Sequence, residues 1–409
     1  MFYGWYIVGC AFVVAVCGWG FGFYGPGVYL ASLRTLYGWP TALVSLAVTL
    51  YYLCSATWII FIGDAIERFG PRRVVLVGCC AMGAGVALLA AAQAPWQTFA
   101  SFVVMSFGWA AMSGAAINAI VAPWFEKKRG LAVSLALNGS SCGGVFVTPL
   151  LVLLTTKLGF QNGLYVAVAG MLAVMIPVSL VLRRRPEDLG LLPDGCHPPG
   201  EDVATAHRTG GQTTWWSRRA ALRDRAFLTI SIPFALGLLA QVGFLTHQIS
   251  YLLQFLEAQS AAAVVSLTTA AAVVGRTTTG FFIDRLDRRV VSAANFVLQT
   301  AALGLLLFAN ATAFIYLGCL LFGLGVGNMI TLPSLIVQHE FPRQYFSKVV
   351  SLVVSVNQFT FAFGPAILGG LRDWSGDYRA SFLFCMTLLT IAAVVVLLGR
   401  QRAEAEGPA

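Results

Sequence analysis

Charged residues are scarce in this sequence. Asp, Glu, Lys and Arg make up 11% of the 409 residues, whereas an ordinary soluble domain carries about 25%. Hydrophobic residues make up 58%. A chain with so little charge cannot cover a soluble surface, and it is typical of a protein that crosses the membrane several times.

Signatures of metal, redox and enzyme chemistry are also missing. The nine cysteines lie almost entirely in apolar runs and never in C-x-x-C spacing, so we interpret them as small buried hydrophobes. The sequence has no nucleotide-binding loop, no zinc spacing and no paired carboxylates within an apolar run. We therefore expect no cofactor, no metal and no enzymatic activity.

Apolar stretches of about 20 residues, the length needed to cross a bilayer as a helix, recur along the whole chain. We expect an all-α membrane protein with 12 transmembrane helices. The first is expected to be retained, because no basic segment precedes it as in a signal peptide. The predicted spans are 6–32, 41–62, 74–92, 97–122, 131–155, 163–182, 227–254, 261–281, 290–308, 311–337, 349–370 and 380–399.

The net charge of +9 is explained by where the basic residues lie. If the loops alternate between two sides, one side holds 21 of the 26 Lys and Arg residues and the other holds four. The positive-inside rule then places both termini and the central loop in the cytoplasm. We expect a multi-pass protein of the plasma membrane, a bacterial inner membrane, with the lipid bilayer rather than nucleic acid as its partner. The basic residue left over is Arg276.

A long polar interruption divides the chain into two sets of six spans. The predicted units are an N-terminal half (1–182), a central cytoplasmic loop (183–225), a C-terminal half (226–400) and a cytoplasmic tail (401–409). Two motifs repeat between the halves: Glu67 and Asp284 follow the second and eighth spans 217 positions apart, and Asn138 and Asn357 lie 219 apart. These offsets indicate duplicated, pseudo-symmetric halves.

The segments "GDAIERFGPRR" (63–73) and "GFFIDRLDRR" (280–289) carry a resemblance to the major facilitator superfamily, whose signature G-x-x-x-D-R-x-G-R-R follows the second span. The first copy departs by Glu for Asp and one inserted residue, and the second by Asp287 for Gly. The resemblance implies two halves that rock about a central site, and a charge network that acts as a gating latch. The latch candidates are Gly63, Glu67, Arg68, Arg72, Gly280, Asp284 and Arg285.

A narrower resemblance comes from "WFEKKRGLAVSLALNGS" (124–140). It is similar to the fifth-span signature of the monocarboxylate transporter family, bacterial members included. The segments "YGW" (3–5), "RRPEDLGLLPDG" (184–195) and "GRTTTGFFID" (275–284) support it. The resemblance implies transport of small organic anions, and an arginine at the position of Arg276 that binds the substrate carboxylate.

Arg276 is costly where it stands, since a cation at a helix centre costs about 2.5–3.5 kcal/mol. It precedes Asp284 by eight residues, about 12 Å along a helix. No acidic residue lies within a predicted span interior; Glu257 is at a span end. We expect an anion-binding arginine, since guanidinium is a bidentate fork for carboxylate. The alternative is an arginine held by helix carbonyls and the hydroxyls of Thr277 to Thr279.

Two departures from the monocarboxylate family bear on proton coupling. Ala272 stands where many relatives have an acid, and Gly27 where many have a lysine. His247, beside Gln241, Thr246 and Gln248, is the titratable imidazole within a span interior. It suits proton handling or substrate binding, and a helix-packing hydrogen bond is the alternative.

Other polar side chains in apolar runs are candidates for the cavity wall. Interhelical hydrogen bonds average about 0.6 kcal/mol, so stabilisation alone explains these side chains weakly, although aromatic residues also pack or lie at the membrane interface. The complete substrate-binding prediction comprises Arg276, His247, Asn118, Asn328, Tyr24 and Asn357.

We predict a secondary active transporter of small organic anions (monocarboxylates), proton-coupled, working by alternating access as a monomer. One alternative is an oxalate/formate-type anion exchanger, which needs no proton. Another is a multidrug efflux facilitator, which the cationic residue disfavours. The last alternative is a receptor or sensor that uses the same fold, but the short loops offer no output domain for such a role.

Overall fold

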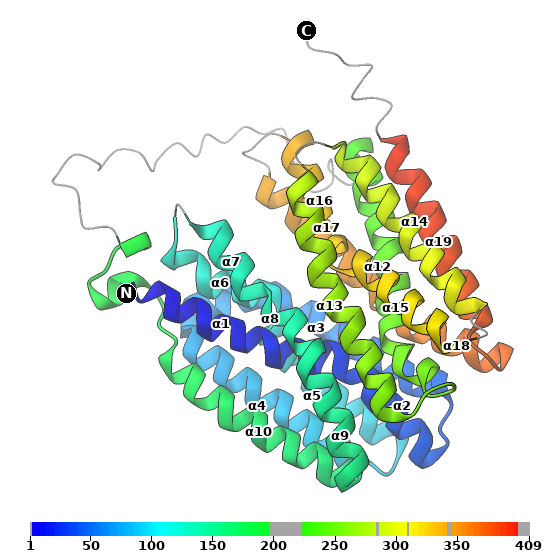
Figure 1. The fold of residues 1–409 in the computed structure, drawn as a ribbon. Coiled ribbons are helices and arrows are strands. Elements are labelled where there is room, and N and C mark those ends of the chain that lie inside the picture. The colour runs from blue at the N-terminus through cyan, green and yellow to red at the C-terminus, as the bar shows by residue number, and fades with distance from the viewer. Residues whose placement is uncertain are drawn as a thin grey trace.

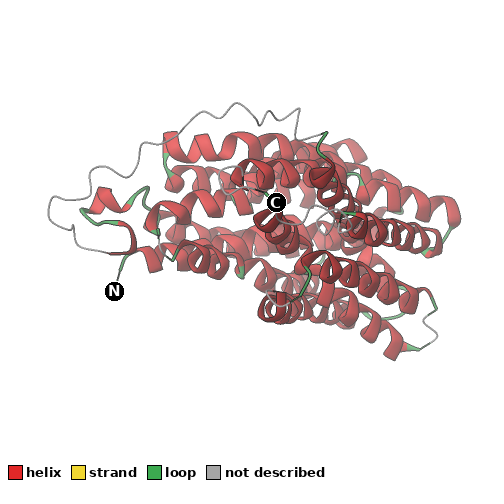
Figure 2. Ribbon diagram, turned by 90° about the horizontal axis from the view of Figure 1, so that it is seen from above, coloured by secondary structure: helices red, strands yellow, loops and turns green. Residues whose placement is uncertain are grey.

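The computed structural model describes residues 2–126, 128–195, 223–283, 286–308, 311–341 and 346–399. Within these ranges every regular element is helical (Figure 2). Twelve helices there are long and apolar enough to cross a membrane, in agreement with the sequence prediction. We number them as spans 1 to 12 in chain order.

Seven spans are single helices: α3 (Thr41–Phe69), α4 (Pro71–Ala90), α10 (Phe160–Val181), α12 (Arg225–Leu252), α13 (Ala258–Phe282), α14 (Arg288–Leu307) and α19 (Arg379–Leu398). The other five are interrupted. Span 1 comprises α1 (Gly4–Trp19), η1 (Gly20–Tyr24) and α2 (Gly25–Tyr37), and span 4 comprises α5 (Pro95–Ala111), α6 (Gly114–Val121) and η2 (Ala122–Trp124). Span 5 comprises α7 (Arg129–Leu137), α8 (Gly139–Cys142), η3 (Gly143–Val147) and α9 (Thr148–Leu158). Span 10 comprises α15 (Thr312–Val326) and α16 (Asn328–Glu340), and span 11 comprises α17 (Phe346–Phe361) and α18 (Gly364–Ser375).

The end of span 2 differs from the prediction by seven residues. We expected it at residue 62, but α3 continues to Phe69 and stops at Gly70, which has φ 82°. The apolar run ends earlier because Asp64, Glu67 and Arg68 are exposed polar residues. The helix continues through them, and Glu67 and Arg68 are good helix formers. The motif around Glu67 therefore lies on the last two turns of a helix rather than in a loop.

Spans 1 and 5 cross at glycines. Each contains a short π-helical segment, η1 and η3, and such segments often occur at functional sites. A Cβ on Gly143 would lie 2.6 Å from the carbonyl oxygen of Val16, and one on Gly20 would lie 2.6 Å from Cβ of Val147. Only glycine permits this approach of the two backbones.

The two six-helix halves meet along two seams. Span 2 (α3) packs against α17 and α18 of span 11, and span 8 (α13) packs against α8, η3 and α9 of span 5; α2 also contacts α12. In Figure 1 the halves converge at the lower right and diverge toward the top. We call the membrane side where span 1 begins at Gly4 the basic side, because most Lys and Arg lie there, and the other the opposite side.

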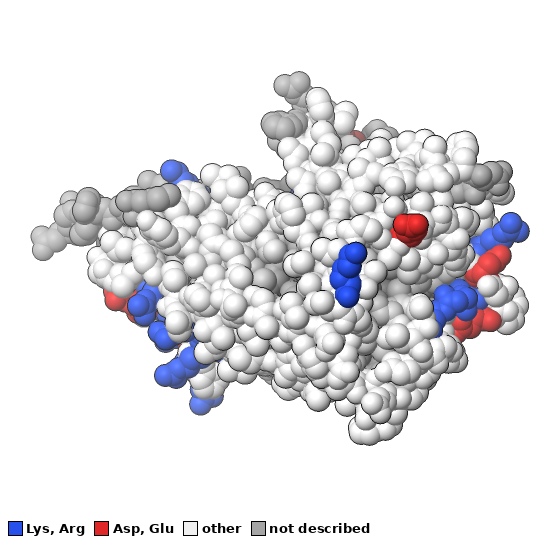
Figure 3. All heavy atoms as spheres, turned by 60° about the horizontal axis from the view of Figure 1, so that its bottom comes forward, with Lys and Arg blue, Asp and Glu red and all other residues white. Residues whose placement is uncertain are grey.

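The surface agrees with a membrane-spanning body. In Figure 3 the charged side chains of the visible face lie in separate groups at its left and right edges and near its middle, and the surface between these groups is uncharged. Large apolar side chains are exposed on many spans, among them Phe61, Phe146 and Trp96. Such a surface needs lipid rather than water around it.

The crossing of spans 1 and 5 generates a stability prediction. We expect Gly143→Ala to lower the thermal stability of the detergent-purified protein by an amount typical of overpacking, about 1–3 kcal/mol, because the new methyl group meets the Val16 carbonyl. Gly170→Ala in α10 is the matched control, since a Cβ there meets nothing within 4 Å. Equal melting temperatures for the two variants would contradict the close crossing.

Candidate substrate-binding site

Arg276 lies half-buried on α13, next to the break in span 10. Its Nε donates a hydrogen bond to the carbonyl oxygen of Gly327, at 3.3 Å. A Cβ on Gly327 would contact the Ala272 carbonyl and lie 3.0 Å from Cβ of Arg276. The break therefore brings a backbone carbonyl to the guanidinium, and glycine keeps the approach open.

The N-terminal half reaches the same place through Tyr24, the last residue of η1. Its hydroxyl and the Arg276 guanidinium are close enough to interact electrostatically. A Cβ on Gly144 in η3 would lie 2.7 Å from Oγ1 of Thr269 and 2.9 Å from the Tyr24 ring. Thr269 precedes Arg276 by two helical turns, so this face of α13 follows the seam between the halves.

The guanidinium has no carboxylate partner in the part of the chain that the structure describes. The ion pairs there involve Arg185, Arg289, Arg372 and Arg379. The hydroxyls of Thr277 and Thr278 donate to carbonyls of their own helix rather than to Arg276. Arg276 thus offers N–H donors that the protein leaves unused.

Asn357 adds an unused acceptor on span 11. The side chain is 5% exposed, and its Oδ1 has no hydrogen-bond partner. The neighbouring Gln358 has an amide Nε2 in the same state. Buried polar atoms without partners are costly, and a substrate-binding role for Asn357 stays a prediction.

Asn328 and Asn118 have partners within the protein. Nδ2 of Asn328 donates to Oδ1 of Asn295 on span 9 at 3.0 Å, while its own Oδ1 is unpartnered. Nδ2 of Asn118 donates to the Gly114 carbonyl one turn earlier, and its side chain is exposed. A substrate-binding role for either stays a prediction.

His247 lies at the seam between spans 2, 7 and 11, fully buried at 1% exposure. Its Nε2 is 3.0 Å from the Pro365 carbonyl and 3.2 Å from Oγ of Ser45. Its Nδ1 is 3.4 Å from the Tyr378 hydroxyl. Burial raises the pKa of Tyr378, so that hydroxyl keeps its proton and can donate to Nδ1, while Nε2–H donates to Pro365. The neutral ring satisfies this arrangement, which connects both halves.

The glutamines beside His247 face other helices of their own half. Nε2 of Gln299 donates to Oε1 of Gln241 at 2.9 Å, and Nε2 of Gln248 donates to Oγ1 of Thr268 at 2.8 Å. On the other face of span 7, a Cβ on Gly27 would lie 2.9 Å from the Thr246 carbonyl. A lysine at position 27, as many relatives have, would fit only if the α2–α12 contact became wider.

The described residues of the predicted latch show no contact between the two halves. Gly63 and Gly280 are exposed, and a Cβ on either would meet nothing within 4 Å. Glu67 pairs with Arg185 at 3.5 Å between exposed side chains, Arg68 lies over the Phe69 ring, and Arg72 is exposed. Asp284 and Arg285 lie outside the described residues. The close helix approach expected of the two glycines is therefore absent from this conformation.

Sequence reasoning missed a buried ion pair on the basic side. Arg289 is 4% exposed and forms two hydrogen bonds to Glu340, at 2.7 and 2.6 Å. It also donates to carbonyls of Thr229 and Val396, so one side chain joins spans 7, 9, 10 and 12. The available signal was an acid at the end of span 10, but no spacing rule connects it with Arg289.

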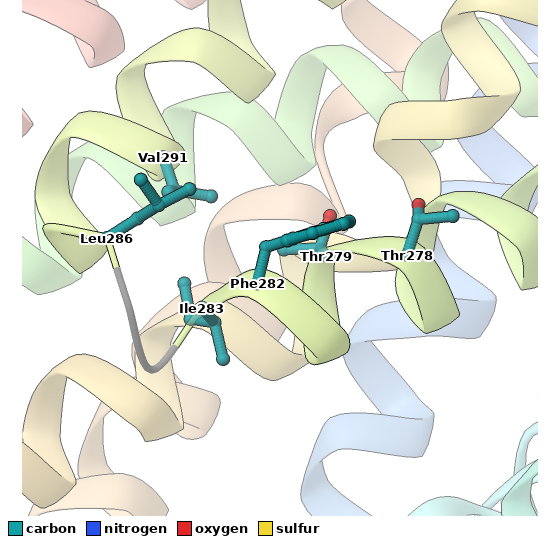
Figure 4. A pocket seen from close by; sticks show the side chains of 6 residues that line it. All are labelled: Thr278, Thr279, Phe282, Ile283, Leu286 and Val291. Atoms are coloured by element: carbon teal, nitrogen blue, oxygen red, sulfur yellow. The ribbon is translucent and has the colours of Figure 1, made fainter.

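A cavity of about 240 Å³ opens at the end of α13 on the basic side. Figure 4 shows its lining side chains, which carry no charge: Thr278, Thr279, Phe282, Ile283, Leu286 and Val291. Arg276 is not among them. This cavity has none of the cationic chemistry of the seam.

The sequence matches the Major Facilitator Superfamily over residues 10–345 and 255–409. The chain belongs to the major facilitator superfamily. It therefore belongs to a family of multi-pass membrane transporters, as the sequence predicted.

Among curated proteins, it is 27% identical to MFS-type transporter 1 of an Ophiocordyceps species, over 68% of this chain and 58% of that protein. It is 25% identical to monocarboxylate transporter 12 of Xenopus laevis (72% and 67%) and 25% identical to monocarboxylate transporter 11 of Mus musculus (84% and 75%). The match thus spans less than two thirds of the Ophiocordyceps relative.

Solved structures share the fold at low identity. A bacterial homologue of the human lysosomal transporter Spinster, inward-facing and unoccupied, superposes with a TM-score of 0.75 at 13% identity, over 98% of this chain and 97% of that one. A D-xylose–proton symporter superposes with a TM-score of 0.71 at 13% identity, over 96% and 97%. These likenesses confirm the major facilitator fold.

The Arg289–Glu340 pair generates a second stability prediction. We expect Glu340→Gln to destabilise the protein by about 3–5 kcal/mol, because it leaves a buried guanidinium without its counter-charge. Thermal unfolding in detergent measures the effect. The control is Arg379→Gln, which breaks an exposed pair with Asp377 worth about 0–1 kcal/mol. A Glu340→Gln variant as stable as the control would show that the pair does not hold the four spans together.

Proposed function

We propose that this chain is a secondary transporter of small organic anions in which Arg276 binds the substrate carboxylate at the seam between the two halves. The observation that carries the proposal is a half-buried guanidinium with no carboxylate partner among the described residues. The relatives named monocarboxylate transporters support the same substrate class.

The geometry suits an end-on carboxylate. Nε is occupied by the Gly327 carbonyl, which leaves the two terminal nitrogens to form the parallel hydrogen bonds of a bidentate pair. Tyr24 from the other half lies beside the guanidinium. An anion held there contacts both halves, so its binding depends on how the halves are inclined.

Orientation follows from the distribution of charge. The positive-inside rule assigns the basic side to the cytoplasm, with both termini there and the membrane a bacterial inner membrane. The closed seams then lie toward the exterior, and the separated ends of the halves toward the cytoplasm. We assign the six-helix units to residues 1–182 and 226–400, joined by the loop 183–225 and followed by the tail 401–409, working as a monomer.

Proton coupling is assigned to His247 and to the substrate itself, because Ala272 replaces the acid of many relatives and Arg276 stays protonated. In the closed seam, the neutral ring accepts from Tyr378 and donates to Pro365. Protonation removes the acceptor, and among the described residues Asp373 is the acid whose charge acts on the ring. Acid on the exterior side therefore favours opening there.

Anion exchange is the second candidate. It is favoured by the same unpaired guanidinium, because an empty cationic site reorients across the membrane less readily than one neutralised by its anion. An exchanger would be accelerated by anion on the far side and would not respond to acid.

The carboxylate site is tested by Arg276→Lys. We expect carboxylate uptake into proteoliposomes to fall at least about 100-fold while insertion and melting temperature are retained, because lysine keeps the charge but loses the bidentate fork. Arg183→Lys, an exposed site on the basic side, is the control and is expected to transport normally. Near-normal uptake by a well-folded Arg276→Lys variant would remove the carboxylate-fork mechanism.

Coupling is tested by uptake between about pH 5.5 and 8 in the parent and in His247→Gln. We expect acid stimulation in the parent and a much weaker response in the variant, which keeps a hydrogen-bonding amide but does not titrate. An unaltered response in the variant would leave substrate protonation as the coupling route. A parent that ignores pH but is accelerated by anion on the far side is an exchanger.

A further inference from the structure

Asp373, near the end of α18, holds the first turn of a helix from the other half. Its Oδ2 accepts a hydrogen bond from the backbone N–H of Ala42 at 2.7 Å. Ala42 is the second residue of α3. The carboxylate thus satisfies one of the N–H groups that a helix leaves unpaired at its start, where the helix dipole also favours negative charge.

The second oxygen of Asp373 is engaged as well. Nη1 of Arg372 donates to Oδ1 at 2.9 Å, and both side chains are mostly buried, at 19% and 23% exposure. Arg372 belongs to the same helix and therefore orients the carboxylate without crossing the seam. The hydrogen bond from the Ala42 N–H crosses to the other half, where the Thr41 hydroxyl also stabilises the carboxylate.

The seam around this bond is closely packed. A Cβ on Gly369 would lie 2.5 Å from Oγ of Ser45 and 3.2 Å from the Thr41 carbonyl. Oγ1 of Thr49 accepts from the Ala366 N–H at 3.2 Å. His247 lies between Ser45 and Pro365. Spans 2 and 11 are thus in direct contact from residue 41 onward on the opposite side.

The other seam is closed differently. Between spans 5 and 8, Oγ of Ser266 donates to the Val145 carbonyl at 3.0 Å, and Thr269 packs on Gly144. Among the residues that the structure describes, no ion pair and no carboxylate at a helix end connects spans 5 and 8. The charged connection between the halves on the opposite side is therefore carried by one seam.

We propose that Asp373 is the lock of the gate on the opposite side: its ionised carboxylate, bound to the start of α3, holds spans 2 and 11 together and must be released in every transport cycle. The lock acts through the position of α3 rather than by touching the substrate. It sets the population of the state that is open on the opposite side, whichever solute is carried.

Two variants remove the bond from its two ends. Asp373→Asn keeps the shape but loses the charge, and charge-assisted hydrogen bonds are roughly twice as strong as neutral ones. Ala42→Pro removes the donor N–H at a first-turn position where helices tolerate proline. Asp377→Asn is the control, because Asp377 pairs with Arg379 on the same side without crossing a seam.

The readout is the accessibility of the closed seam. A single cysteine at Thr49, which is 3% exposed, is introduced into a cysteine-free chain that carries each variant. In sided proteoliposomes, a membrane-impermeant maleimide is applied to one face at a time without substrate. We expect labelling from the opposite side to become about tenfold faster in Asp373→Asn and Ala42→Pro, and to stay at the parent rate in Asp377→Asn.

The result that would overturn the lock is parent-rate labelling of Asp373→Asn in protein that keeps its melting temperature. If Ala42→Pro fails to fold, Asp373→Asn decides the question alone. Because no anion is present, failure here leaves the carboxylate site untouched, and failure of Arg276→Lys to impair uptake leaves the lock untouched.

Discussion

The guanidinium of Arg276 must be solvated inside an apolar span, and the surrounding helices are arranged around that requirement. Span 10 is divided at Gly327, and the carbonyl of this residue accepts from Nε. Span 1 contributes Tyr24 from the end of a π-helical segment. Breaks in transmembrane helices are tolerated where neighbouring groups satisfy the freed backbone. The irregular parts of spans 1 and 10 thus converge on one cation.

Much of the fold could be predicted because it depends on local composition. Apolar length and the distribution of arginines identified the spans and the two halves. The helical end of span 2 was missed, since Asp64 and Glu67 interrupt the apolar run without interrupting the helix. The π-helical segments were also missed, because they arise from the crossing of Gly20 and Gly143 with distant residues.

The site could be predicted only in part. Arg276 was identifiable because a lone cation in an apolar run is conspicuous by its cost. Asn328 and His247 were identifiable as polar residues in apolar runs. Their partners, Asn295 and Pro365, lie 33 and 118 residues away in the sequence. No spacing rule relates such pairs. A polar residue in a span indicates that it has a hydrogen-bond partner. The sequence does not show whether that partner is another helix or a transported solute.

Spans 2 and 11 run antiparallel, so the start of each lies beside the end of the other. Asp373 stands at the end of span 11, and Glu67 stands near the end of span 2, 26 residues beyond Thr41, about 39 Å away along the helix. The unbroken helix α3 is long enough to work as a lever. A tilt of about 10° around its middle moves the two ends in opposite directions by roughly 3 Å each, about the length of a hydrogen bond. The two membrane faces therefore need no separate signal, because the stiffness of the helices carries the loss of a bond at one end to the other.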